Sequence, residues 1–183
     1  MIELDASIGE GGGQVLRYSL ALASITGRDV RLRNVRVKRE RPGLQHQHLA
    51  ALRLLASLTR AYVEGDELGS TEVYFRPSGI FGGRYSVDVG TAGSVTLVLQ
   101  SALPVMAFAD SRTEVILRGG TDVPRSPTYD YFRGVFLAYL RRMSYGVEME
   151  LVRRGHYPRG GGEVRVIVPG RASLTPLVAE RRG

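Results

Sequence analysis

The sequence contains no cysteine and no tryptophan, and only one of its 25 basic residues, Lys38, is a lysine. The absence of cysteine excludes disulfides, thiolate nucleophiles and cysteine-based zinc sites, and it favours a cytoplasmic protein. No apolar run approaches the roughly 18 residues that a membrane-spanning helix needs, so we expect no membrane partner. Because Lys38 is the one lysine, the positive charge is carried almost wholly by guanidinium groups, which bind phosphate bidentately. A general preference for arginine codons or a thermophilic background explains the same bias equally well.

What the sequence does contain is enough apolar material for a folded core. The chain has 183 residues, of which 43% are hydrophobic, and this suffices for one well-packed domain or two small ones. Its net charge of +7 favours an anionic partner. Charge alone does not distinguish RNA from DNA, a nucleotide or an acidic lipid.

Hydrophobic periodicity and glycine-rich breaks predict the same order of elements twice. In the first half we expect strands, helices and a hairpin in the order strand 2–5, helix 14–26, strand 30–36, helix 44–60 and strands 62–64 and 72–75. In the second half we expect strand 85–89, helix 95–109, strand 112–118, helix 128–143 and strands 147–152 and 163–168.

A spacing of 82 residues supports an internal repeat. It separates Arg36 from Arg118 and also Pro42 from Pro124 (118 − 36 and 124 − 42). We therefore predict an α+β fold made of tandem β-α-β-α-β-β repeats, with the helices on one face of mixed sheets. The first repeat covers 1–78 and the second covers 79–169. Residues 170–183 are expected to begin a connection to a missing insert or a third repeat.

The stretch from Arg36 to His48 reads R-V-K-R-E-R-P-G-L-Q-H-Q-H and joins a predicted strand to a predicted helix. Arginine side chains and the unpaired amides of a helix N-terminus both bind phosphate, so this junction favours a phosphate site. Because side chains alternate along a strand, we expect Arg36 to continue the core-facing row of Val30 and Leu32. The alternative is a charged segment that faces water.

The loop G-E-G-G-G-Q, residues 9–14, lies between a predicted strand and a predicted helix, which is the usual place for a phosphate cradle. It matches neither the Walker pattern nor G-x-G-x-x-G. Glu10 would repel a phosphate unless a divalent cation lay between them, so Glu10 is a candidate metal ligand. A surface glutamate in a glycine-rich turn is an equally good interpretation.

Polar residues on the predicted helices give further candidates. We expect Gln14 and Arg17 to project towards the glycine loop, although the pattern around Arg17 taken alone favours an exposed helix residue. His46 and His48 are two positions apart on a helix and so point about 200° apart, which argues against a paired metal site. His48 is either a core histidine or a member of the site, and Gln100 lies within an otherwise apolar helix where its amide needs partners.

Five motifs together resemble the RNA 3'-terminal phosphate cyclases. They are G-E-G-G-G-Q at Gly9, R-V-K-R-E-R-P-G-L-Q-H-Q-H-L at Arg36, T-A-G-S-V-T-L-V-L-Q at Thr91, R-G-G-T-D-V-P-R-S-P at Arg118 and G-H-Y-P-R-G-G-G at Gly155. The resemblance implies an enzyme that uses ATP and Mg²⁺ or Mn²⁺. In that family a histidine is adenylylated, AMP passes to the RNA terminal phosphate, and the ribose 2'-OH then closes a 2',3'-cyclic phosphate.

The resemblance also assigns roles by position. Glu10 corresponds to the metal-contacting carboxylate, and the ATP side is formed by Gln14, Gln100 and Pro127, with Pro127 against the adenine. The pocket for the terminal phosphate of the RNA 3' end corresponds to Arg17, Arg36, Arg39, Gln47 and His48.

One departure from the family is large. Its members are about twice as long and carry the nucleophilic histidine near the C-terminus, in a motif that none of the three histidines here occupies. We therefore expect this chain to be the N-terminal part of a cyclase, with the rest of the same protein as its partner. We expect the chain alone to form no enzyme-AMP adduct. Two alternatives stay open. One is a non-catalytic relative that serves ribosome assembly, although the intact pocket residues argue against it. The other is an enolpyruvyl-transferase-like enzyme.

Overall fold

The structure is a computed structural model that describes residues 1–178 and 180 of the chain. The first half contains the elements β1 (Ile2–Asp5), α1 (Gly13–Thr26), β2 (Val30–Arg33), α2 (His46–Thr59), β3 (Tyr62–Glu64) and β4 (Val73–Arg76). The second half contains β5 (Gly83–Asp88), α3 (Val95–Met106), β6 (Thr113–Gly119), α4 (Tyr129–Tyr131), the π-helix η1 (Phe132–Phe136), α5 (Leu137–Arg142), β7 (Glu148–Arg153) and β8 (Gly162–Val168).

The two halves build sheets of identical topology. The strand orders are β1-β2-β4-β3 and β5-β6-β8-β7, and in each sheet the first pair is parallel and the other pairs are antiparallel. A helix connects each parallel pair, as such a crossover requires, and a hairpin closes each half. The predicted α+β class with tandem repeats is therefore confirmed.

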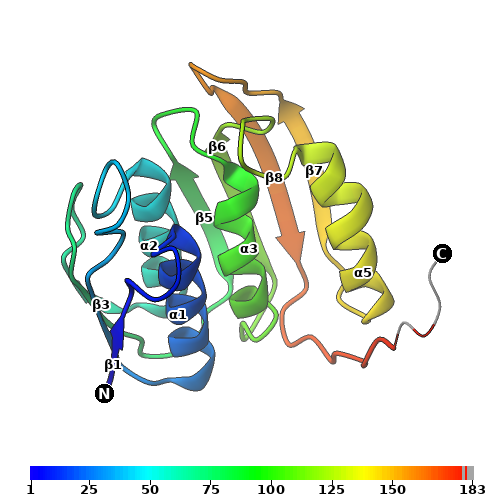
Figure 1. The fold of residues 1–183 in the computed structure, drawn as a ribbon. Helices are drawn as coiled ribbons and strands as arrows, with labels where there is room; N and C mark the ends of the chain where they lie inside the picture. Colours follow the sequence, from blue (N-terminus) through cyan, green and yellow to red (C-terminus); the bar gives the residue numbers. More distant parts are fainter. Residues whose placement is uncertain (179, 181–183) are drawn as a thin grey trace.

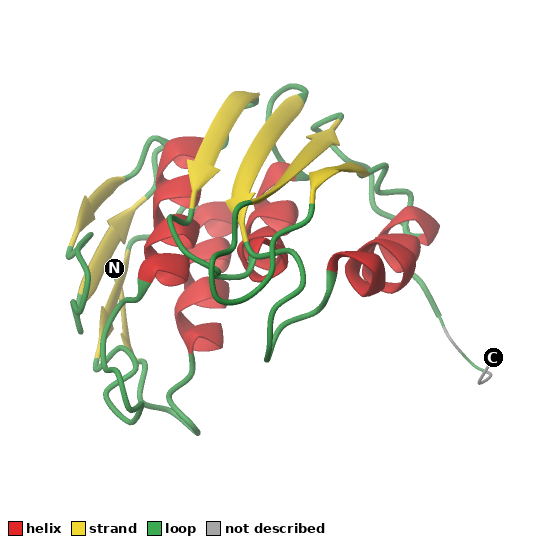
Figure 2. Ribbon diagram, turned by 90° about the horizontal axis from the view of Figure 1, so that it is seen from above, coloured by secondary structure: helices red, strands yellow, loops and turns green. Residues whose placement is uncertain are grey.

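The helices of both halves share one layer on the inner side of the sheets. Helices α1, α2 and α3 lie side by side, whereas α5 stands apart at the end of the second sheet (Figure 1, Figure 2). Their leucines repeat at intervals of three and four residues and become the core, since that spacing gathers side chains on one helix face. Fully buried examples are Leu16, Leu20, Leu52, Leu55, Leu99 and Leu103.

The strand predicted for 30–36 is too long, and the predicted position of Arg36 on its core-facing row is wrong. β2 ends at Arg33, and the chain then turns through positive φ at Asn34 and Arg36, both 57°. Arg36 donates from Nη1 to the carbonyl oxygens of Arg41 at 2.7 Å and Gly43 at 2.8 Å. Its guanidinium thereby closes a loop over 34–43, which alternation along a strand cannot predict.

The predicted helix 128–143 is also interrupted. A π-helical segment, η1, separates the short α4 from α5, and Gly134 lies within it. No helix in the described part of the chain is long and apolar enough to cross a membrane. After β8, residues 169–178 form neither helix nor strand.

Candidate functional site

Two cavities adjoin where the loops of both halves meet, and they share Gln47, Leu97 and Arg125. The larger, of about 650 Å³, we name the cationic cavity. Its remaining lining residues are Gly12, Gly13, Gln14, Arg17, Arg36, Lys38, Arg39, Glu40, Arg41 and His48. The second cavity, of about 560 Å³, is otherwise lined by Ala92, Ser94, Val123, Pro124, Ser126 and Tyr157. Cationic groups far outnumber the single carboxylate in the first cavity, so it is suited to an anion.

The N-terminus of α1 opens onto the cationic cavity. Gly12 is its N-cap, no side chain caps it, and its first turn has no acidic residue. The free amides and the positive end of the helix dipole are therefore available to an anion. A Cβ atom on Gly13 would collide with Nε2 of His48 and would come within 3.2 Å of Nη1 of Arg17. Only glycine lets the helix start this close to both side chains.

Arg17 is the most unusual charge in the cavity. Its side chain comes from the first turns of α1 and the residue is only 8% exposed. Nε of Arg17 has no hydrogen-bond partner, and no carboxylate pairs with its guanidinium among the residues that the structure describes. Burial accordingly lowers the pKa of Arg17. A buried guanidinium without a counter-ion is costly, and a bound anion would offset that cost.

His48 lies at the start of α2 and is also 8% exposed. Burial, together with the charges of Arg36 and Arg17, lowers the pKa of His48 to about 3, so the ring is neutral near neutral pH. Its Nδ1 accepts a hydrogen bond from the backbone N–H of Gln45 at 3.2 Å, which assigns the proton to Nε2. His48 is thus both buried and part of the cavity, and it can donate a hydrogen bond to an anion there.

The loop over 34–43 supplies four further cations of the cavity: Arg36, Lys38, Arg39 and Arg41. Burial, and then the charge of Arg39, lower the pKa of Arg36. Arg39 donates to Oε2 of Glu10 at 3.1 Å, and Lys38 donates to the carbonyl oxygen of Gly9 at 3.3 Å. These contacts fix the basic loop against the glycine loop, so that the two segments face each other across the cavity.

Glu10 lines neither cavity; its side chain is 89% exposed and, among the described residues, forms an ion pair with Arg39 alone. No group of three His, Asp or Glu side chains able to hold a metal occurs within residues 1–178 and 180. Glu10 alone would supply one carboxylate to a divalent cation, so phosphate oxygens and water would have to supply the remaining ligands. The role of Glu10 as a metal ligand stays a prediction.

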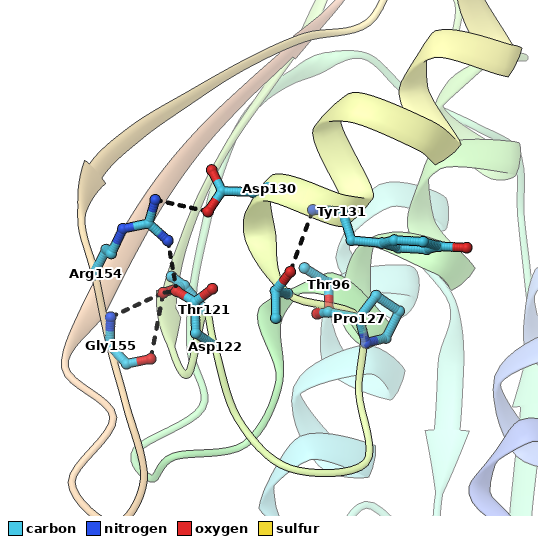
Figure 3. Close-up of polar contacts among 9 residues, drawn as sticks. Thr96, Thr121, Asp122, Pro127, Asp130, Tyr131, Arg154 and Gly155 are labelled. Carbon is cyan, nitrogen blue, oxygen red and sulfur yellow. Dashed lines mark hydrogen bonds and ion pairs between the residues drawn. The ribbon is translucent and has the colours of Figure 1, made fainter.

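The structure brings together six of the predicted residues around one cavity: Gln14, Arg17, Arg36, Arg39, Gln47 and His48. Gln100 and Pro127 line neither cavity. Gln100 is half-buried on α3. The Pro127 carbonyl oxygen accepts a hydrogen bond from Oγ1 of Thr96 at 2.8 Å, which fixes the loop to α3 (Figure 3). The expected contacts of these two residues with ATP stay predictions.

Comparison with known proteins shows the family of this chain. The family described as RNA 3'-terminal phosphate cyclase matches residues 8–179. The chain belongs to the RNA 3'-terminal phosphate cyclase family. Proteins named RNA 3'-terminal phosphate cyclase from Hyperthermus butylicus and Desulfurococcus amylolyticus are 54% and 49% identical over 185 and 184 residues, covering 100% of this chain and 51% and 52% of those proteins. One from Methanopyrus kandleri is 50% identical over 183 residues, 100% of this chain and 52% of its own length. The chain spans about half the length of these curated relatives.

Among the side chains that line these cavities, sequence reasoning did not name Lys38, Glu40, Arg41, Arg125 and Tyr157 as candidates. The repeat could have pointed to Arg125, because it follows Gly43 by the same 82 residues (125 − 43). Both positions have positive φ, 70° at Gly43 and 62° at Arg125, so the two loops turn alike. The second loop thereby directs a cation to the place where the cavities meet.

A polar network fixes the loop that carries Arg125 (Figure 3). Arg154 of the β7–β8 connection contacts Oδ2 of Asp122 at 3.1 Å and Oδ2 of Asp130 at 2.8 Å. The hydroxyl of Thr121 donates to Asp122 at 2.6 Å and accepts from the N–H of Gly155 at 3.0 Å. The pKa of Asp122 is lowered, because these hydrogen bonds outweigh the opposing effect of burial. The loop is thus held at both ends before any ligand binds.

Proposed function

We propose that this chain holds the terminal phosphate of an RNA 3' end and the phosphates of ATP, and that the complete protein converts that end to a 2',3'-cyclic phosphate while ATP is cleaved to AMP and pyrophosphate. The observation that carries the proposal is Arg17, a buried cation whose Nε has no partner in the described structure. An anionic ligand would supply the counter-charge that the protein does not.

The residues of the cavity suit this task because phosphoryl chemistry depends mainly on positioning and charge neutralisation. Arg17 and the free amides of α1 would hold one side of a terminal phosphate, and neutral His48 would donate from Nε2. Arg36 and Arg39 would neutralise the phosphates from the opposite loop. A divalent cation, when bound, would neutralise further phosphate charge, and Glu10 is the residue here that would hold it.

Binding of short RNAs to the 183-residue chain tests this proposal. An oligoribonucleotide that ends in a 3'-phosphate should bind more tightly than the same RNA with a 3'-hydroxyl, and Arg17→Met should remove that preference. An exposed arginine beyond the same helix, Arg28, provides the matched control: Arg28→Met should retain the preference. Equal binding of the two RNAs by the unaltered chain would contradict the proposal.

A further inference from the structure

The motif G-H-Y-P-R-G-G-G, residues 155–162, has no role in the proposed phosphate chemistry. It connects β7 to β8, and its Tyr157 lines the second cavity. Tyr157 is 72% exposed. An aromatic side chain that lies over a cavity instead of packing into the core is available to a ligand.

Backbone contacts on two sides hold this connection in place. The carbonyl oxygen of Gly155 accepts hydrogen bonds from the N–H groups of Thr121 at 2.8 Å and Asp122 at 3.1 Å. On the other side, Gly160 lies so close to Thr91 that a Cβ atom on Gly160 would meet the Thr91 carbonyl oxygen at 2.5 Å. The backbone segment that carries Tyr157 is therefore positioned by the fold before a ligand arrives, which lowers the entropy cost of binding.

The lining of the second cavity fits a nucleobase. Its apolar surfaces come from Ala92, Leu97, Val123, Pro124 and Tyr157, and its polar groups come from Gln47, Ser94, Arg125 and Ser126. No carboxylate lines it. A flat aromatic base needs an aromatic or apolar face and a few hydrogen-bonding groups at its edge. The volume of about 560 Å³ lies within the usual range for small-molecule sites.

We propose that the second cavity takes the base of the RNA nucleotide that carries the terminal phosphate, with Tyr157 as the stacking surface. This inference rests on the proposed function. The two cavities share Gln47, Leu97 and Arg125, so only a short spacer separates their ligands. In a 3'-terminal nucleotide that spacer is one ribose, whereas in ATP the base is separated from the terminal phosphate by the ribose and two further phosphates. The exposed side of Tyr157 leaves room for the rest of the RNA to leave the site.

Three RNAs and two variants test the inference by fluorescence anisotropy with the 183-residue chain. The RNAs are a trinucleotide with a 3'-phosphate, the same RNA with a 3'-hydroxyl, and a 3'-phosphate RNA whose last residue is a tetrahydrofuran without a base. Tyr157→Ala should weaken binding of the first RNA on the order of tenfold, because it removes one base-stacking contact. Tyr157→Phe keeps the ring and should bind like the unaltered chain.

The base-free RNA shows whether the lost contact is with the terminal base. The unaltered chain should bind it about as weakly as Tyr157→Ala binds the complete RNA, and Tyr157→Ala should cause no further loss with it. Tyr157→Ala should keep the preference for 3'-phosphate over 3'-hydroxyl and should leave ATP binding unchanged. Loss of ATP binding without loss of RNA binding would assign the cavity to ATP and overturn the inference. Equal affinity for RNAs with and without the terminal base, with the preference for a 3'-phosphate retained, would also overturn the inference. If the preference for a 3'-phosphate is absent too, the proposed function fails together with the inference.

Discussion

The side-chain oxygen of Gln47 accepts a hydrogen bond from the backbone N–H of Ser94 at 2.9 Å. Gln47 lies in the first turn of α2 and Ser94 is the N-cap of α3, so this bond joins the two halves at the point where the cavities meet. Ser94 is 2% exposed, so its N–H is a largely buried donor.

Gln47→Ala should therefore lower the free energy of unfolding by about 1–3 kcal/mol, because it leaves a buried donor unsatisfied. Urea denaturation measures the change. Gln47→Glu is the matched variant, since it keeps an acceptor and should retain most of the stability. The added negative charge in the cationic cavity should nevertheless weaken binding of 3'-phosphate RNA. If Gln47→Ala unfolds at the same urea concentration as the unaltered chain, the bond does not join the halves as described.

Removing the buried charge of Arg17 should separate stability from function. Arg17→Met keeps the length of the side chain but no longer places an unpaired guanidinium in the core, so the free energy of unfolding without ligand should stay the same or rise by about 1–3 kcal/mol. Binding of 3'-phosphate RNA should be lost. Denaturation with and without the RNA measures both effects. Arg28→Met, at an exposed position, should change neither, and a strongly destabilised Arg17→Met protein would show that Arg17 is structural.

The pKa of His48 predicts a specific loss of stability in acid. Because burial and the nearby arginines lower the pKa from its ordinary value of 6.5 to about 3, the unfolded chain takes up this proton before the folded chain does. Stability from His48 is complete above pH 6.5 and falls as the pH decreases towards 3, by up to about 1.4 kcal/mol per pH unit. His48→Gln should lose this component, measured as a shallower fall in unfolding free energy over that range. His46→Gln, at an exposed position, should keep the slope of the unaltered chain.

The close approach of Gly13 to His48 predicts a steric effect. Gly13→Ala should displace the His48 ring and Arg17, and so should weaken binding of 3'-phosphate RNA at least tenfold, while the helical circular dichroism signal remains. Gly134 offers the matched control, because a Cβ atom there meets nothing within 4 Å. Gly134→Ala should bind RNA normally. Normal binding by Gly13→Ala would show that the cavity can adjust around a methyl group.

The 183-residue chain alone should form no covalent adduct with AMP. The Nδ1 atom of His48 accepts a hydrogen bond and its Nε2 carries the proton, so neither nitrogen has a free lone pair, while the exposed His46 and His156 line neither cavity. None of the three is placed to attack a nucleotide held there. Incubation with ATP labelled on the α-phosphate, followed by denaturing electrophoresis, measures this, and a stable label on the polypeptide would refute the expectation.

The sequence by itself determined the repeated element order, the apolar face of each helix and the cluster of basic residues beside a glycine loop. These features follow from local composition and from hydrophobic periodicity, which can be recognised within a few turns of helix or one strand. The tertiary structure decided what the side chains of that cluster do. Arg36 lies in a turn of positive φ after the strand and closes its own loop. Arg125 reaches the same cavity from a loop about 80 positions further along the chain than the basic cluster. Arg17 and His48 are buried beside one cavity because α1, α2 and α3 pack in one layer. Their burial depends on packing between helices, which a local sequence pattern does not predict.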